Sequence, residues 1–530
     1  MARTAPVPNI PAIPGMNPGL FVLGGGADSG GSGAGGGKGK GGKQRGSGKN
    51  AGKDAKGGGK GAPDPKKYPK CGTASHPVDV GTGRAFTHPI LILELGGPLP
   101  LRIERSYSSS ASQIDAGLGF GWAWSLGWRV EERRRSVHVW TDLGTCISLD
   151  DGPDVGHEVI ADFGFGVRRE PWGYRVDPND GRFYLFAEKL DEQTWGLSAI
   201  TDRNGNEIRL AYQGGTLTEV KDSAGRVLRI RRTPGDHIAS IDVKNALSGG
   251  QWIAFEAYDY DEHGHLVRAT DADGFCARYE YDSEHRLTSD TDRSGLRFVF
   301  RYDEEGRCIE SWGDYPGGPD PSLDAEIPAM LASGTHPAKG IHHCVFEYLG
   351  DVTHVIDSTF VRTYELNEHG LLVSALDSGP VPSRAEYDER GFLTVDEGPD
   401  GGVELFERDA RGNLLRYTSA LGHVTTVARD EHGLPVSIED PLGGVTRMER
   451  DGAGNTVRLT NALGEVTTFR YDARGLLTER IDPNGAASKF EYDDQGNLVR
   501  GTVEGSAKGF QKSAMTSPPW AYAAIISALP

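Results

Sequence analysis

Cysteine is scarce in this chain: only five cysteines occur among 530 residues, far apart and without a Cys-x-x-Cys pair. An odd number at such spacings indicates neither a structural zinc site nor a dense disulfide framework. We therefore expect scattered, reduced thiols. The five are Cys71, Cys146, Cys276, Cys308 and Cys344.

Long hydrophobic runs are also absent. No segment reaches the roughly 18 apolar residues that a membrane helix needs, so the sequence predicts no membrane span. Prolines interrupt the chain repeatedly between Pro6 and Pro14, and the N-terminus lacks the apolar core of a signal peptide. If the protein is secreted or displayed on the cell surface, we expect a dedicated machine or a partner to export it from the cytoplasm.

The sequence contains no recognisable catalytic pattern. There is no Gly-x-Ser-x-Gly motif and no cysteine with a plausible partner. The neighbouring pairs His263/His265 and His342/His343 lack carboxylates at ligand spacing, so we interpret them as surface histidines. We predict no catalytic, cofactor-binding or metal-binding residues and no enzymatic activity; an enzyme with an unrecognised site is the less favoured alternative.

Clustered positive charge is missing outside a lysine-rich N-terminal segment. The formal net charge is −18, which argues against a broad nucleic-acid-binding face. Hydrophobic residues make up 37%, while glycine occurs 75 times. This composition predicts a structure dense in turns.

What the chain does contain is a tandem repeat. Aspartate, or once asparagine, recurs every 21 residues, and glycine always stands three residues later, which identifies a repeat unit. In the longest uninterrupted series, the repeat units begin at Asn367, Asp388, Asp409, Asp430, Asp451, Asp472 and Asp493. Earlier units begin at Asp261, Asp282 and Asp303, and the middle one carries His285 where the others carry glycine.

Each unit is predicted to be a β-hairpin. Asp-x-x-Gly fits a four-residue turn whose Asp bonds the backbone and whose glycine takes a positive φ. Residues alternate before the turn, as in Phe469 to Tyr471, and a second turn follows about ten residues after the first Asp. Single hairpins are marginal in water, so the units should pair as a continuous antiparallel ribbon.

Two sets of segments carry a resemblance. Tyr471 to Leu476 and Tyr492 to Leu498 resemble the YD repeats of the Rhs family. Upstream, the segments His76 to Gly83, Gly97 to Ser108 and Gly117 to Trp128 resemble the DUF6531-type module that opens many Rhs proteins. The last segment holds tryptophans that we interpret as core residues rather than a sugar-binding platform: Trp122, Trp124 and Trp128.

The resemblance implies a scaffold. Rhs repeats wind into a β shell that encloses a variable C-terminal toxin, which is released by self-cleavage at an Asp-Pro-x-Gly type of motif beyond the last repeats. Asp440 to Gly443 has these letters, but further repeats follow it, so we interpret it as an ordinary turn. We therefore expect a polymorphic-toxin scaffold that is truncated before its autoprotease core and its toxin.

The sequence divides into eight predicted segments. They are a Pro-rich leader at 1–22, a disordered Gly/Lys linker at 23–70, an opening β module at 71–150, a β-rich region with degenerate repeats at 151–250, YD repeats at 251–312, an irregular insertion at 313–345, YD repeats at 346–505 and a non-repeat tail at 506–530. In the tail the register lapses at Ala514 and Ser517, and our hypothesis is a truncated, frameshifted or split gene.

These observations predict an all-β fold, a curled ribbon forming an incomplete shell. The expected function is that of a secreted scaffold used in bacterial competition. Expected partners are the secretion machinery or a spike protein, bound through the leader, and a toxin on a separate or lost segment. The alternative is a surface protein that binds carbohydrate or a neighbouring cell through its repeats.

Overall fold

The computed structural model of the chain describes residues 73–74, 77–245, 250–314, 330–377 and 379–504. The predicted leader, linker and non-repeat tail lie outside the described residues. Within them the fold is all-β, as predicted, with two short 3-10 turns. Four sheets are present, three small ones and one long ladder that we call the ribbon.

The small sheets belong to the opening module. Their strands are β1 (Thr73–Ala74), β2 (Val78–Asp79), β3 (Ile90–Leu95), β4 (Leu101–Tyr107), β5 (Trp122–Trp124), β6 (Arg129–Arg133), β7 (Ser136–Trp140), β8 (Cys146–Leu149), β13 (Glu188–Lys189) and β14 (Thr194–Gly196). The 3-10 turn η1 (Ser109–Ala111) follows β4. The hairpin β13–β14 comes later in the chain but joins the module by pairing β14 with β6.

All other strands form the ribbon, in which each strand pairs antiparallel with the next. They are β9 (Glu158–Ile160), β10 (Gly166–Glu170), β11 (Gly173–Asp177), β12 (Arg182–Phe186), β15 (Ala199–Asp202), β16 (Glu207–Gln213), β17 (Thr216–Lys221), β18 (Val227–Arg232), β19 (Ile238–Asn245), β20 (Gln251–Tyr260), β21 (Leu266–Asp271), β22 (Cys276–Tyr281), β23 (Leu287–Thr291), β24 (Arg297–Tyr302), β25 (Cys308–Asp314), β26 (Ile341–Leu349), β27 (Val352–Ile356), β28 (Val361–Leu366), β29 (Leu372–Leu376), β30 (Ser383–Tyr387), β31 (Leu393–Glu397), β32 (Val403–Arg408), β33 (Leu414–Thr418), β34 (Val424–Arg429), β35 (Pro435–Glu439), β36 (Val445–Arg450), β37 (Thr456–Thr460), β38 (Val466–Tyr471), β39 (Leu477–Ile481), β40 (Ala487–Tyr492) and β41 (Leu498–Glu504), with η2 (Asp162–Gly164) after β9.

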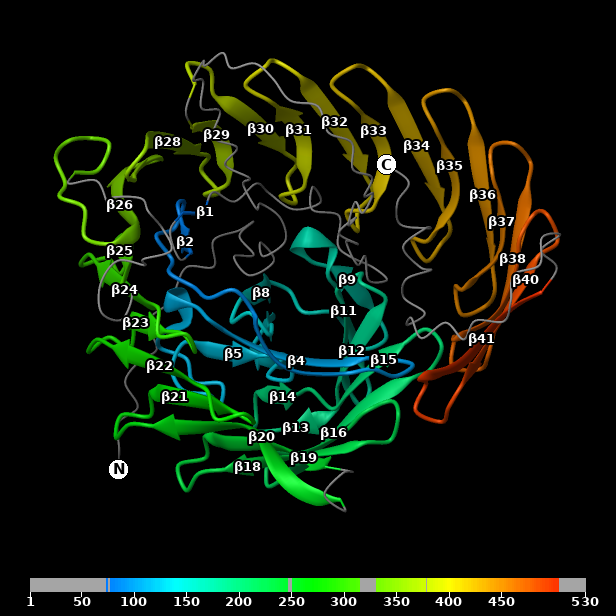
Figure 1. Cartoon of the computed structure of the whole chain (residues 1–530), viewed down its shortest axis with the longest axis horizontal. Coiled ribbons are helices and arrows are strands. Elements are labelled where there is room, and N and C mark those ends of the chain that lie inside the picture. Colours follow the sequence, from blue (N-terminus) through cyan, green and yellow to red (C-terminus); the bar gives the residue numbers. More distant parts are fainter. Residues whose placement is uncertain (1–72, 75–76, 246–249, 315–329, 378, 505–530) are drawn as a thin grey trace, which may run out of the picture.

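The ribbon curls into a ring around the opening module (Figure 1). Its order could close into a barrel only if β41 paired with β9, but among the described residues the registers pair β41 with β40 alone. The ribbon is therefore an open strip with two ends, as predicted for an incomplete shell. Its last strands lie beside its first ones, at the right of the view.

The repeat turn is held by the carboxylate of its first residue. Asp472 Oδ1 accepts hydrogen bonds from the backbone N–H groups of Arg474 and Leu476, both at 2.9 Å. Gly475 donates its N–H to the Asp472 carbonyl at 3.0 Å and has φ 75°, as the sequence predicted. The pairing register shifts at Tyr471, where the chain enters the turn. The turn at Asp440 has the same bonds and lies between two ordinary hairpins.

In several units the tyrosine before this Asp ties the hairpin to the preceding one. Tyr471 Oη donates to the carbonyl of Thr456 at 2.9 Å, fifteen residues back. Equivalent bonds start from Tyr281, Tyr302, Tyr387 and Tyr492. Arginine replaces the tyrosine at Arg408, Arg429 and Arg450, and Arg429 and Arg450 still donate to the corresponding carbonyl. Donation to that carbonyl, rather than aromaticity, is what these units share.

The main core joins the opening module to the first part of the ribbon. Trp122 is 1% exposed and packs in one cluster with ribbon residues such as Ile230 and Tyr279. Trp124 and Trp128 belong to the same cluster, so the prediction of core tryptophans is confirmed. Along the chain the cluster ends at Phe392, and the described strands from β32 to β41 form a wall one sheet thick. Small modules gain most of their stability from such shared burial.

We expect Tyr471→Phe to destabilise the protein by about 1 kcal/mol, because the Thr456 carbonyl loses its donor without a change in shape. Equilibrium unfolding in urea would measure the loss. Tyr364→Phe is the matched control, since no hydrogen bond of its hydroxyl occurs among the described residues, and it should change stability little. Equal losses in the two variants would contradict this role of Tyr471.

Candidate functional site

The ribbon has two rims, formed by the turns at opposite ends of its strands. We call one the seated rim because its turns rest against earlier parts of the chain. The seated rim comprises the turns 261–265, 282–286, 303–307, 367–371, 388–392, 409–413, 430–434, 451–455, 472–476 and 493–497. The exposed rim comprises the turns 271–275, 292–296, 398–402, 419–423, 440–444, 461–465 and 482–486. The long line of contact along the seated rim is the candidate functional site.

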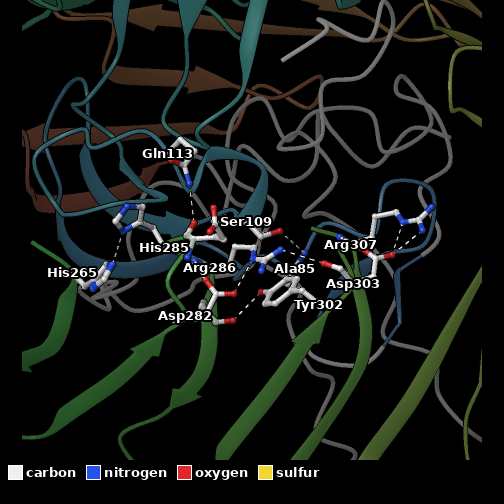
Figure 2. Close-up of polar contacts among 12 residues, drawn as sticks. Ala85, Ser109, Gln113, His265, Asp282, His285, Arg286, Tyr302, Asp303 and Arg307 are labelled. Atoms are coloured by element: carbon white, nitrogen blue, oxygen red, sulfur yellow. Dashed lines mark hydrogen bonds and ion pairs between the residues drawn. The ribbon is translucent and has the colours of Figure 1, made fainter. Parts of the chain in front are cut away.

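The first turns of the seated rim rest on the opening module (Figure 2). Tyr107 lies between them: its hydroxyl accepts the N–H of Leu287 at 2.8 Å and donates to the carbonyl of His285. Gln113 donates to the carbonyl of Glu284 at 2.8 Å. Burial raises the pKa of Tyr107, so this hydroxyl keeps its proton and can act as a donor.

A buried charge fixes the same contact. Arg105 is 2% exposed and donates to Tyr279 Oη at 2.8 Å, and it lies 3.4 Å from a carboxylate oxygen of Glu256. Glu256 also accepts the hydroxyl of Tyr258 at 2.7 Å. Burial by itself lowers the pKa of Arg105, but Tyr279 and Glu256 outweigh it and the pKa rises. A paired buried charge of this kind enforces one docking position, because any shift would leave it unpaired.

The turn with histidine in place of glycine lies in this contact. His285 has φ 60°, a left-handed conformation that costs a side-chain-bearing residue free energy. Its ring stacks on Phe120 of the module at 4.1 Å and lies 2.7 Å from the ring of His265. We interpret these contacts as the compensation for the backbone strain. The expectation of surface histidines is wrong for His265 and His343, which are 6% and 3% exposed.

Later turns of the seated rim rest on the beginning of the ribbon itself. Arg411 forms an ion pair with Asp177 at 2.8 Å. Asn179 donates to the carbonyl of Arg411 at 3.1 Å and to the side chain of Asn413 at 2.9 Å. Asn179 also adopts a left-handed φ of 65°, which directs its amide toward the turn 409–413. These bonds join residues more than 230 positions apart in the sequence.

We call this line of contact, between later turns of the seated rim and turns at the beginning of the ribbon, the seam. It continues through Asn204 and Asn206 of the early ribbon. Asn204 and Asn455 exchange side-chain hydrogen bonds, the shorter at 2.7 Å. Asn206 donates to the carbonyl of Arg474 at 2.9 Å. Gly475 lies against Asn204 so closely that a side chain at its position would overlap the amide. The seam is thus a line of hydrogen bonds between turns. Each of these turns stabilises its own hairpin and also bonds to a turn that is far away in the sequence.

These asparagines did not stand out in the sequence. Asn204 and Asn206 lie in the turn 202–206, which has the repeat-like letters Asp-Arg-Asn-Gly-Asn, so their place in a turn was visible. Nothing in that spacing indicates which turn some 250 residues later they meet. Sequence reasoning found the hairpins and missed the seam, because the partner depends on the curvature of the whole ribbon.

Metal ligands and thiols are the reactive groups to consider in the described residues. Among the described residues, no three His, Cys, Asp or Glu side chains are grouped so as to hold a metal ion. The described cysteines form no disulfide with one another, and burial raises the pKa of the Cys308 thiol to about 12, which makes it unreactive at neutral pH. The described part of the chain holds no helix of the length and hydrophobicity that a membrane crossing requires.

Two family models match the chain. The domain of unknown function DUF6531 matches residues 75–148, the opening module. The RHS repeat matches 260–297, 281–311, 408–445, 429–466, 450–487 and 471–507. The chain therefore carries a DUF6531 module followed by RHS repeats.

Curated relatives are much longer than the matched region. The chain is 27% identical over 346 residues to probable deoxyribonuclease RhsB of Dickeya dadantii, an alignment that covers 62% of the chain and 22% of that protein. It is 28% identical over 227 residues to double-stranded DNA deaminase toxin A of Burkholderia cenocepacia, covering 39% of the chain and 15% of that protein. The chain therefore spans a minor part of the relatives it matches.

Solved structures with partial similarity come from toxin complexes. The complex TcdB2-TccC3-Cdc42 matches with a TM-score of 0.41 at 13% identity, covering 78% of the chain and 26% of that protein. The Photorhabdus luminescens Tc holotoxin pore matches with a TM-score of 0.35 at 12% identity, covering 77% and 25%.

Acidification should loosen the contact at His285. Burial and the neighbouring His265 lower the pKa of His285, so the unfolded chain binds this proton more readily than the folded one. The stability that depends on this site is present above about pH 6.5 and is lost as the pH falls below it. His263, Glu284 and Asp282 also face the ring, and the two carboxylates only moderate the effect.

Melting temperatures between pH 8 and pH 5 would measure this loss in the intact protein and in His285→Gly. The glycine variant removes the titrating ring and the left-handed strain together, so its melting temperature should fall less on acidification. Parallel curves for the two proteins would show that His285 does not contribute.

Two glycine variants distinguish the contribution of the seam from the strain within a turn. Gly475→Ala and Gly464→Ala both place a side chain at a left-handed position, which costs about 1 kcal/mol each. Only Gly475 faces Asn204; Gly464 faces open space. Hydrogen exchange in β15 and β16 should therefore speed up in Gly475→Ala and stay unchanged in Gly464→Ala. The same exchange in both variants would mean that the seam does not stabilise the early strands.

Proposed function

We propose that the chain is a non-catalytic scaffold, the β shell of a secreted Rhs-type polymorphic toxin. In this proposal the ribbon encloses and delivers a C-terminal toxin that is carried on another segment. The observation that carries the proposal is the seam: the turns from 409 to 475 bond to turns of the early ribbon, so the strip is held as a wound wall.

The opening module supports the same function. It lies inside the ring in the view of Figure 1 and shares one core with the first half of the ribbon. A buried ion pair, Arg105 with Glu256, fixes how the module sits on the ribbon. A wall that is seated on a module along one rim can retain a polypeptide on its inner side. We infer that the module closes one end of the container.

The relatives suggest where an activity would lie. Two of them bear the names of a deoxyribonuclease and a DNA deaminase toxin, yet the similarity to this chain covers only 22% and 15% of them. We propose that the shared part is the container and that their enzymatic activities belong to the remainder. By this reasoning the chain needs a toxin as a partner and a secretion machine or spike protein for export by a route without a signal peptide.

A surface-binding role is the alternative. Exposed aromatic and acidic residues of the repeats could bind carbohydrate on a neighbouring cell, and Phe275 on the exposed rim is 59% exposed. Binding of the full chain to a glycan array would favour this role, whereas a container has no need of it.

Protection of a cargo tests the container directly. We expect a small reporter domain fused after Pro530 to resist a protease that digests the same reporter when it is added separately. Arg411→Ala should remove protection because it breaks the ion pair with Asp177 across the seam. Arg416→Ala is the matched control, since Arg416 lies near Glu407 on the neighbouring strand instead. Equal digestion of the fused and the separate reporter would refute the proposal.

A further inference from the structure

Three leucines on the exposed rim are almost fully in water. Leu421, Leu442 and Leu463 are 82%, 97% and 84% exposed. Each is the third residue of its turn, and they follow one another at 21-residue spacing. Successive hairpins are about 10 Å apart, because each contributes two strands, so the leucines form a row roughly 20 Å long. We call this the leucine row.

The turn itself does not require leucine. The corresponding third position holds Asp400 in the hairpin before the row and Asn484 in the hairpin after it, and these turns have the same backbone bonds. A fully exposed leucine gains nothing from burial, so a row of three indicates a contact that covers them.

The described chain ends at this same rim. Strand β41 starts at the seated rim and runs to Glu504, which lies opposite Ala487. Ala487 directly follows the turn 482–486 of the exposed rim. Glu504, the last described residue, therefore lies at the rim that carries the leucine row, and 26 residues, 505–530, follow it in the sequence. A chain spans up to about 3.3 Å per residue, so Trp520 can reach roughly 50 Å, farther than Leu421.

The chemistry of these 26 residues complements the rim. They contain Lys508 and Lys512 and no acidic residue, and their last part is apolar. The apolar side chains that could cover leucines are Trp520, Tyr522, Ile525, Ile526 and Leu529. Acidic residues flank the row on the exposed rim, at Glu439, Asp440 and Glu465.

We propose that residues 505–530 bind along the exposed rim, with their apolar part on the leucine row and their lysines beside its carboxylates. In this arrangement the exposed rim, like the seated rim, is covered by another part of the chain. This inference does not depend on the container function. It would hold equally for a surface-binding protein.

Hydrogen exchange of the full chain tests the contact. We expect the backbone N–H groups of residues 519–530, other than Pro519 and Pro530, to exchange at least about tenfold more slowly than in an unstructured peptide. The triple variant Leu421→Ser, Leu442→Ser, Leu463→Ser should restore fast exchange without unfolding the ribbon, because all three side chains are exposed. Leu349→Ser is the control, since Leu349 is 60% exposed at the end of β26, outside the exposed rim, and it should leave the protection intact.

Three outcomes would overturn the proposal. Fast exchange of residues 519–530 in the unchanged protein would show that the segment does not bind. Protection that survives the triple variant would place the segment elsewhere. Protection that grows with protein concentration, together with a doubled mass in solution, would mean that a second copy of the chain covers the leucine row.

Discussion

The structure depends on one local interaction, the acceptance of two backbone N–H groups by the carboxylate of a turn aspartate. In the turn at Asp472 these bonds fix the hairpin, and the left-handed glycine then leads the chain back into the ladder. Because the units repeat at the same spacing, their turns lie at the same two ends of the strands. The turns therefore form two continuous rims. A carboxylate engaged in this way is a structural acceptor, which explains why a chain so rich in aspartate groups no metal ligands among its described residues.

The two rims then take different roles. Turns on the seated rim carry polar side chains and carbonyls that face other turns, and the seam between Asn204 and Asn455 shows how a turn can bond across as well as within. Such hydrogen bonds are individually modest, about 1 kcal/mol each. Their number along the rim, together with the buried Arg105 at the module, holds the curvature. Late strands have little core of their own, so the wall from β32 to β41 relies on the seam more than the early strands do.

Local features of the fold could be predicted and distant ones could not. The hairpin unit, the turn geometry and the core tryptophans all follow from periodicity and residue type over a few positions, and the structure confirms them. His285 was visible as an exception to the glycine pattern, yet its stacking on Phe120 depends on a module that precedes it by about 165 residues. The same holds for the misjudged His265, which looks like a turn residue in the sequence and is buried only because the module lies over it. The partners of Asn179 and Asn206 depend on ribbon curvature, which no short pattern encodes.

A strip that is wound in this way has an inherent problem at its last strand. Among the described residues β41 is an edge strand, and Val499 and Val503 on it are 62% and 63% exposed, with Val503 near the rim that carries the leucine row. Exposed edge strands with apolar side chains invite pairing with other chains. A barrel would remove the edge by closing, but among the described residues β41 does not pair with β9. The late turns instead contact the early ribbon through side chains and carbonyls, as Arg411 does with Glu158 and Asp177. The winding that makes a wall therefore leaves an edge beside the rim on which we propose that residues 505–530 bind.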